Sequence, residues 1–315
     1  MSAPLLSVII CTHNPRADFL ARTLASLRAQ TLPSSAWELL LIDNASSVPL
    51  QPDAARPGHP SARVIAEREV GLTAARLRGI DEARAEVLVF VDDDNLLDPS
   101  YLARASDLAT AWPMLGVWGC GHYSPEWEIA PPAAFSEYIR YLAVHRAPLD
   151  RWSNQPFDYA ATPAGAGLCV RAPVSRRYAH SVRTDPRRKL LGRTGGNLAG
   201  CEDFDLALTA TDLGLGTGVF TELAMTHLMP RNRIEEPYLL RLVEGHACST
   251  VILMALRDQN LHPPRRHLLA RLREWRLRRS LAPVNLKIHD ARRRGERTAW
   301  SLLAAAHAPR VSASP

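Results

Sequence analysis

Three short apolar runs, at residues 5–11, 37–42 and 87–91, most constrain how this chain folds. They are rich in leucine, isoleucine and valine and do not alternate with polar residues. Such runs are typical of strands buried on both faces of a parallel sheet. Segments of helical period lie between them, at residues 19–30 and 72–85. Strands that alternate with helices predict a doubly wound α/β sheet.

Acidic residues follow two of these runs, where the predicted strands end. Asp43 follows the second run, and Asp92, Asp93 and Asp94 follow the third. Ligands of doubly wound sheets bind at the carboxyl ends of the strands. Adjacent carboxylates repel each other, and their oxygens suit Mg²⁺ or Mn²⁺ that also binds substrate phosphates. The pattern therefore predicts a cation site; the alternative is a solvated turn capped by Asp94 or Asn95.

A second acidic pair and a histidine follow in the less regular second half of the chain. Glu202 and Asp203 begin a helix predicted over residues 202–213. They either complement the helix dipole or supply a general base beside the cation site. His227 comes after a strand predicted over residues 218–223, and a lone histidine is more often structural than a ligand.

Two other segments of the second half show no clean period. Residues 118–164 mix tryptophans, tyrosines and prolines, which predicts a loop-rich substrate region. Residues 183–196 are basic and contain glycines, which predicts a mobile segment. Beyond His227, Arg231 and Arg233 either grip a phosphate or are simply solvated.

The charge of the chain is uneven. Residues 257–315 carry 14 basic against 4 acidic residues, a net charge of +10. The whole chain is +6, so residues 1–256 are −4. A basic region favours phosphate-bearing partners such as nucleic acid, anionic lipid or a polyphosphate substrate. The alternative is a solvated, arginine-rich helix face.

Composition excludes several classes of protein. No uninterrupted apolar stretch approaches the ~18 residues that span a bilayer, and the N-terminus lacks the pattern of a cleaved signal. The five cysteines are scattered, with no Cys-x-x-Cys spacing. This argues against a disulfide framework or a zinc knuckle and suits a reducing compartment. We therefore expect a cytoplasmic protein.

Five motifs, in their order along the chain, closely resemble those of the family 2 glycosyltransferases, which have the GT-A fold. The resemblance covers about residues 5–250. It looks most like bacterial enzymes that assemble extracellular or capsular polysaccharide. The motifs are Ser-Val-Ile-Ile-Cys-Thr-His-Asn at 7–14, Glu-Leu-Leu-Leu-Ile-Asp-Asn-Ala-Ser at 38–46, Gly-Leu-Thr-Ala-Ala-Arg at 71–76, Phe-Val-Asp-Asp-Asp-Asn at 90–95 and Cys-Glu-Asp at 201–203.

This resemblance implies the fold and its boundaries. The expected fold is α/β, a Rossmann-like mixed sheet flanked by helices in the GT-A arrangement of nucleotide-diphospho-sugar transferases. Residues 1–256 would form the catalytic domain. Within it, residues 1–115 would bind the nucleotide-sugar, and residues 116–256 would bind the acceptor and carry the base. Residues 257–315 would form a basic helical extension.

The resemblance also implies the chemistry, an inverting and metal-dependent transfer of a sugar from a nucleotide-diphospho-sugar. Asp203 would be the general base, with Glu202 beside it. Asp94 and His227 would hold Mn²⁺ or Mg²⁺ on the donor diphosphate. The residues expected to bind the donor are Thr12, His13, Asn14, Asp43, Arg76, Asp92, Asp93 and Arg231.

The donor would be UDP-, GDP- or dTDP-linked, and the acceptor a saccharide or lipid-linked sugar in surface polysaccharide synthesis. Two other functions compete with this one. A sugar-phosphate nucleotidyltransferase would show a Gly-rich basic loop after the first strand, which residues 12–15 are not. A nucleic-acid-binding protein would need stacking aromatics among its basic residues. Trp275 and Trp300 are too few, so we expect no nucleic acid partner.

The basic tail contains one amphipathic pattern. Leu268, Leu272 and Trp275 share a helix face, and arginines lie largely off it. Such a helix either lies at an anionic membrane surface or packs on the catalytic body or on a second subunit, as in a homodimer. In the first case the protein would be peripheral on the inner face of the plasma membrane.

Overall fold

The computed structural model describes residues 3–258, 261–263 and 268–307. A single mixed sheet runs through this part of the chain. Its strands are β1 (Leu6–Thr12), β2 (Trp37–Asn44), β3 (Arg63–Glu67), β4 (Val87–Asp92), β5 (Asn95–Leu97), β6 (Leu115–Trp127), β7 (Arg151–Ser153), β8 (Leu168–Arg171) and β9 (Gly216–Met229). They lie in the order β3-β2-β1-β4-β8-β6-β9-β5, with β7 paired to β9.

The N-terminal strands form the parallel part of the sheet, as the three apolar runs predict. β1 pairs in parallel with both β2 and β4, and β2 pairs with β3. The register places Thr12 beside Asp43 and Cys11 beside Asp92. The carboxyl ends of these strands therefore meet at one edge of the sheet, where the predicted ligand residues gather.

The second half adds long strands that the sequence pattern does not reveal. The sequence predicts a loop-rich region over residues 118–164, but β6 extends to Trp127 and pairs with β9 along most of its length. Glycines and a proline interrupt its apolar pattern. A Cβ on Gly121 would lie 2.7 Å from the carbonyl oxygen of Phe220, so the close approach of the two strands itself requires glycine there. β9 is also longer than predicted and contains His227 instead of ending before it.

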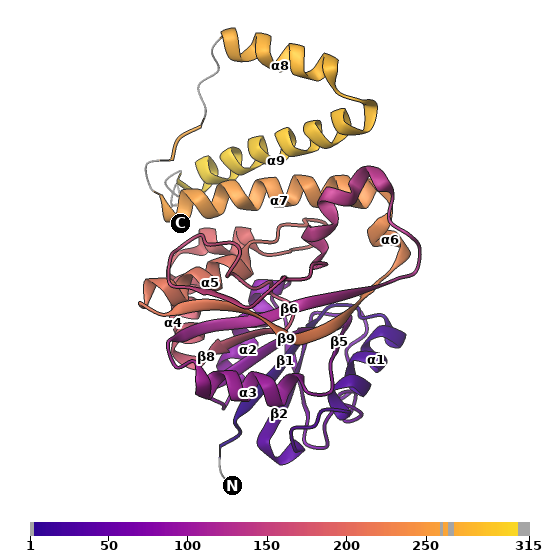
Figure 1. Ribbon diagram of the computed structural model, residues 1–315, viewed down its shortest axis with the longest axis vertical. Helices are drawn as coiled ribbons and strands as arrows, with labels where there is room; N and C mark the ends of the chain where they lie inside the picture. The colour runs from indigo at the N-terminus through magenta and orange to yellow at the C-terminus, as the bar shows by residue number, and fades with distance from the viewer. Residues whose placement is uncertain (1–2, 259–260, 264–267, 308–315) are drawn as a thin grey trace, which may run out of the picture.

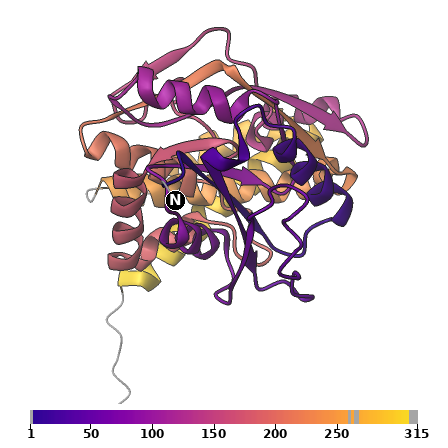
Figure 2. The ribbon, with the colours of Figure 1, turned by 90° about the horizontal axis from the view of Figure 1, so that it is seen from below.

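Helices cover both faces of the sheet (Figure 2). The leucines of α1 (Ala17–Arg28) and α3 (Tyr101–Ala111) pack in the core on one face. The apolar sides of α2 (Leu72–Glu82), α4 (Ala172–Thr184) and α5 (Glu202–Asp212) pack in the core on the other. The central strands are therefore buried on both faces, which explains why their sequences do not alternate.

An ion pair lies at the start of α1. Asp18 has the right chemistry for an N-cap, but the N-cap position is Arg16, and Asp18 lies inside the first turn. Its carboxylate instead accepts hydrogen bonds from the Arg16 guanidinium.

Helices at the C-terminal end form a further layer above the sheet (Figure 1). They are α6 (Arg231–Ile234), α7 (Glu236–Arg257), α8 (Leu268–Ser280) and α9 (Pro283–His307). α9 lies along α7, so closely that a Cβ on Gly295 would lie 2.1 Å from the carbonyl oxygen of Glu244. In the described part of the chain, α7 is the one helix long and apolar enough to cross a membrane, with a mean hydropathy of 1.5 over its most apolar window. Its Leu239 and Ile252 are nevertheless fully buried in the protein.

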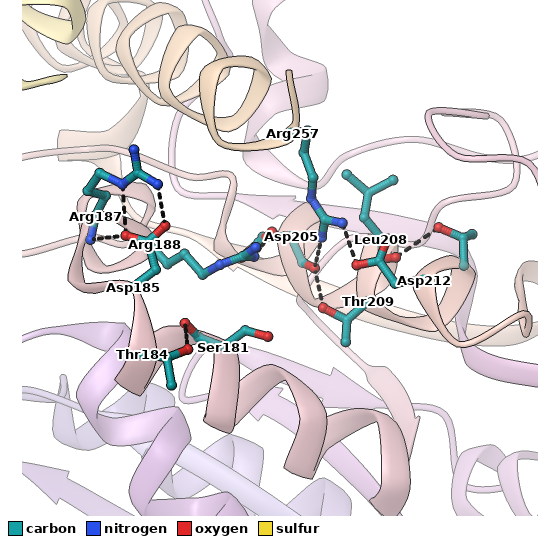
Figure 3. Close-up of polar contacts among 11 residues, drawn as sticks. Ser181, Thr184, Asp185, Arg187, Arg188, Asp205, Leu208, Thr209, Asp212 and Arg257 are labelled. Carbon is teal, nitrogen blue, oxygen red and sulfur yellow. Dashed lines mark hydrogen bonds and ion pairs between the residues drawn. The ribbon is translucent and has the colours of Figure 1, made fainter. Parts of the chain in front are cut away.

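A buried ion-pair network ties α5, α7 and the 3-10 helix η3 (Pro186–Leu191) together (Figure 3). Asp205 of α5 has no exposed surface, and its carboxylate lies 2.5 Å from Arg188 and 2.9 Å from Arg257. Arg257 also pairs with Asp212 at 2.5 Å. The segment 183–196, which the sequence predicts to be mobile, is thus built into the fold through Arg188.

Candidate functional site

A cavity of about 930 Å³ opens at the carboxyl ends of the parallel strands, between the sheet and α7. This volume lies within the range of small-molecule sites, about 300–1,000 Å³. Nine of the twelve predicted site residues line the cavity, although they come from distant parts of the sequence. They are Thr12, His13, Arg76, Asp92, Asp93, Asp94, Glu202, Asp203 and His227.

The acidic run after β4 forms one wall. Asp94 is buried, and its carboxylate lies 2.7 Å from the Arg233 guanidinium and 3.3 Å from His227 Nε2. Burial alone would raise the pKa of Asp94, but the charges of Arg233 and His227 hold it below its usual range. Burial, together with the charge of Asp94, raises the pKa of Asp93 to about 6. Thr12 donates its hydroxyl hydrogen to Asp93.

His227 reaches Asp94 because β9 pairs antiparallel with β5, which places His227 opposite Asn95. The imidazole is buried, and Nδ1 lies 3.5 Å from the carbonyl oxygen of Ala143. Nε2 has no hydrogen-bond partner among the described residues.

Asp94 and His227 fit a metal site that substrate completes. No cluster of three or more His, Cys, Asp or Glu side chains suited to a metal occurs within residues 3–258, 261–263 and 268–307. Mg²⁺ and related cations are commonly bound through one or two protein ligands and substrate phosphates, without an all-protein cage. The buried Nε2 of His227 lies 3.3 Å from the Asp94 carboxylate and makes no hydrogen bond among the described residues, so the two side chains offer ligand atoms to one cation and match that arrangement.

The second acidic pair, at the start of α5, also lines the cavity. The carboxylate of Asp203 accepts hydrogen bonds from the backbone N–H groups of Gly165 and Phe204, both at 2.8 Å. Glu202 is buried 3.3 Å from the guanidinium of Arg76, and its second carboxylate oxygen has no hydrogen-bond partner among the described residues. A Cβ on Gly165 would lie 2.6 Å from Arg76 and 3.1 Å from Asp203. Glycine at this position therefore lets the backbone of residue 165 approach both side chains.

Burial perturbs both acids of this pair. Burial raises the pKa of Glu202 to about 7. The positive charge of Arg76 acts to lower this pKa, and the negative charge of Asp203 raises it further. Burial also raises the pKa of Asp203 above its usual range, again against Arg76. Perturbed carboxylates in a cleft are typical of acid–base sites, and this pair can hold or release a proton close to neutral pH.

Three predicted site residues do not line the cavity. The carboxylate of Asp43 is buried and accepts backbone hydrogen bonds at residues 46 and 50, so it shapes the loop after β2. Asn14 has a φ of 50° and binds Ser47 of that loop. The side chain of Arg231 is largely exposed and pairs with Glu235 at 3.4 Å.

Two cationic residues outside the set expected to bind the donor also line the cavity. Arg233, two residues after Arg231, lines the cavity and contacts Asp94. The spacing alone did not distinguish the two arginines, because only the short helix α6 sets which one turns inward. Arg193 also lines the cavity, and its carbonyl oxygen accepts the Leu72 N–H at the start of α2. Arg193 lies in the glycine-rich run Gly-Arg-Thr-Gly-Gly. An arginine among glycines was the sequence feature that could have marked it as a site residue.

The C-terminal helices also contribute to the cavity. His246 comes from the middle of α7 and Arg292 from α9. No local motif marks either residue, since only the packing of α7 and α9 over the sheet brings them there.

Comparison with known proteins relates the first part of the chain to one family. Residues 7–129 match glycosyl transferase family 2. The protein y4gI of Sinorhizobium fredii is 30% identical over 169 residues, which cover 48% of this chain and 18% of that protein. YwdF, an uncharacterised glycosyltransferase of Bacillus subtilis, is 30% identical over 107 residues, which cover 34% of this chain and 39% of YwdF. The chain thus spans well under half the length of these relatives.

Among solved structures, the whole described fold resembles a larger enzyme. The mannosyltransferase PcManGT from Pyrobaculum calidifontis, in complex with GDP-Man and Mn²⁺, superposes with a TM-score of 0.54 and 20% sequence identity. The superposition covers 98% of this chain and 76% of PcManGT. At this identity the similarity concerns the fold, a mixed α/β sheet flanked by helices.

Proposed function

Because the chain belongs to glycosyl transferase family 2 through residues 7–129, and its fold is GT-A-like, we propose that it transfers a sugar from a nucleotide-diphospho-sugar to an acceptor hydroxyl. One observation carries the proposal. Asp94 with His227 and Glu202 with Asp203 line a single cavity, so that groups suited to a metal-bound diphosphate and groups that can accept a proton share one site.

The proposed donor pocket lies at the acidic run after β4. A UDP-, GDP- or dTDP-linked sugar would lie with its nucleoside near Thr12 and His13 and its diphosphate near Asp94. The Mn²⁺ and GDP-Man bound by PcManGT support this choice of ligands. Mn²⁺ or Mg²⁺ held by Asp94 and His227 would neutralise charge on the departing diphosphate. Arg233 and Arg193 also line the cavity and add positive charge there.

Asp203 is the proposed general base of an inverting displacement. Its carboxylate removes the proton from the acceptor hydroxyl as the oxygen bonds to the anomeric carbon, and the bond to the diphosphate oxygen breaks on the opposite side. The backbone N–H groups of Gly165 and Phe204 fix the orientation of this carboxylate. Arg76 holds Glu202 aside in an ion pair, which leaves Asp203 to face the acceptor.

We propose a saccharide or lipid-linked acceptor in surface polysaccharide synthesis. The resemblance of the motif set to bacterial polysaccharide enzymes supports this choice. The acceptor would enter beside α7, where His246 and Tyr141 line the cavity.

A thermal-shift screen of UDP, GDP, dTDP and CDP, each with and without Mn²⁺, tests the proposed function. One nucleotide should raise the melting temperature, and more so with Mn²⁺, because a ligand at 100 times its Kd stabilises the native state by about 2.7 kcal/mol. The matching nucleotide-sugar, with acceptor, should then release the nucleoside diphosphate. Pyrophosphate release from a nucleoside triphosphate and a sugar phosphate would instead identify a nucleotidyltransferase. If no nucleotide stabilises the protein, with or without Mn²⁺, the proposal fails.

A further inference from the structure

Helix α8 stands apart from the rest of the protein, beyond α9 (Figure 1). Its large apolar side chains are exposed to solvent, although most residues of this kind are buried elsewhere in the fold. Leu268 is 72% exposed and Trp275 is 55% exposed. The exposed apolar residues of α8 are Leu268, Leu269, Leu272, Trp275 and Leu277.

Two contacts fix which side of α8 faces the protein. Glu274 lies 3.3 Å from His289 of α9, and Arg278 pairs with Asp290 of α9. Residues about half a turn away therefore face outward.

The outward side of α8 mixes leucines with arginines. It carries Leu269, Leu272, Arg273 and Arg276, all of them exposed. Beside them, the guanidinium of Arg279 lies 4.7 Å from the centre of the Trp275 ring.

We propose that this side of α8 docks on the surface of an anionic lipid bilayer. A helix lying in the headgroup region buries leucines and tryptophan at the acyl boundary, while arginines extend to lipid phosphates. The leucines on the outward side then contact acyl chains, and the arginines contact lipid phosphates. A nucleic acid would neutralise the arginines and leave the leucines in water. A second copy packed about a twofold axis would bring two copies of the same arginine-rich side together, with like charges facing each other.

The proposal goes beyond the sugar transfer and gives α8 and α9 a role in placing the cavity. Arg292 of α9 lines the cavity, so the helix that carries α8 also supplies part of the site. Docking through α8 would hold that side of the cavity at the membrane, on the inner face of the plasma membrane for a cytoplasmic protein.

Vesicle flotation of the full chain at low salt tests the proposal. The probes are phosphatidylcholine vesicles with and without phosphatidylglycerol, and the variants are Arg273→Gln/Arg276→Gln and Leu272→Ser/Trp275→Ser. All four substituted side chains are exposed, so the variants should fold, as thermal melts will show. Arg176→Gln/Arg177→Gln on α4 is the matched control, because it removes two exposed arginines and the same net charge elsewhere.

The full chain should float with the anionic vesicles only, and added salt should release it. Loss of Arg273 and Arg276 should weaken partition roughly 30-fold, since each basic residue near an anionic surface contributes about 1 kcal/mol. The leucine–tryptophan variant should also bind more weakly, and the α4 control should bind like the full chain. No flotation at low salt, or equal losses in the control, overturns the proposal. Dimers that the leucine–tryptophan variant dissociates would identify a second copy as the occupant, and tighter binding to duplex DNA than to vesicles would identify nucleic acid.

Discussion

Among single residues, Asp203 occupies the position on which the proposed chemistry depends most directly. Asp203→Asn keeps the shape of the side chain and its contact with the Gly165 N–H but removes the basicity. We expect turnover to fall about 10²–10⁴-fold with donor affinity little changed. Steady-state rates and nucleotide titrations measure the two effects separately. Asp107→Asn on α3, at an exposed position, is the control. An equal loss of donor affinity would make Asp203 a binding residue.

Arg233 and Arg231 form a matched pair two positions apart. Arg233→Ala should weaken binding of the nucleotide with Mn²⁺ about 10-fold or more, because it removes the partly buried partner of Asp94 beside the proposed diphosphate. Arg231→Ala should change it less than twofold, since that side chain is largely exposed. Calorimetric titration compares the two variants. Equal effects would contradict the placement of Arg233 at the donor.

Glu202 makes the stability of the fold depend on pH. Its pKa is 4.5 in an unfolded chain and about 7 in the fold, so folding favours its protonated form. The contribution of Glu202 to the free energy of unfolding is therefore fully present below pH 4.5 and is lost as the pH rises through 7. Glu202→Gln cannot titrate.

Between pH 4.5 and 8, the free energy of unfolding should fall more in the parent than in Glu202→Gln. The pKa difference sets an upper limit of about 3 kcal/mol on this effect. Urea unfolding at several pH values measures both proteins. Parallel pH curves would show that the pKa of Glu202 is ordinary in the fold.

At the scale of elements, Asp205 joins three helices through two arginines. Asp205→Asn removes the negative charge that compensates Arg188 and Arg257, so we expect a loss of about 3–5 kcal/mol in the free energy of unfolding. Asp212→Asn is the control. Asp212 is half exposed and pairs with the same Arg257, and its loss should cost less than about 1 kcal/mol. Urea unfolding distinguishes the variants, and equal costs would contradict the structural role of Asp205.

The elements also show how far the sequence determines the fold. β1, β2 and β4 could be predicted because strands buried on both faces have continuous apolar sequences. β6 could not, because its close approach to β9 selects glycine, which in a sequence resembles a loop. β5 could not either, since it is three residues long and forms only against β9.

The same reasoning applies to the site. Asp94 follows a predictable strand, so its place at the sheet edge could be predicted. Its contact with Arg233 depends on residues 139 positions apart meeting through β9 and α6, which no local pattern encodes. Arg292 enters only because α9 packs on α7.

At the scale of the whole molecule, one sheet joins residues 1–115 and 116–256, the proposed donor and acceptor halves. β4 pairs with β8 in the middle of the sheet and β5 pairs with β9 at its far edge, so strands from both halves share one hydrogen-bonded array. We expect β1 and β6 to unfold in a single transition, because neither half can lose its strands without exposing the core of the other. Hydrogen exchange in increasing urea should give the two strands the same midpoint. Separate midpoints would show that the halves are independent folding units.

The pairing of β9 with β5 and β6 has a consequence for synthesis of the protein. A nascent chain that has just left the ribosome through β6 already contains the parallel strands β1 to β4 and Asp94. His227 and Arg233 are translated about 100 residues later. Until then the long strand β6 has an unpaired edge, and unpaired edges make folding intermediates prone to aggregate. We therefore expect the growing chain to need chaperone protection chiefly between translation of β6 and β9.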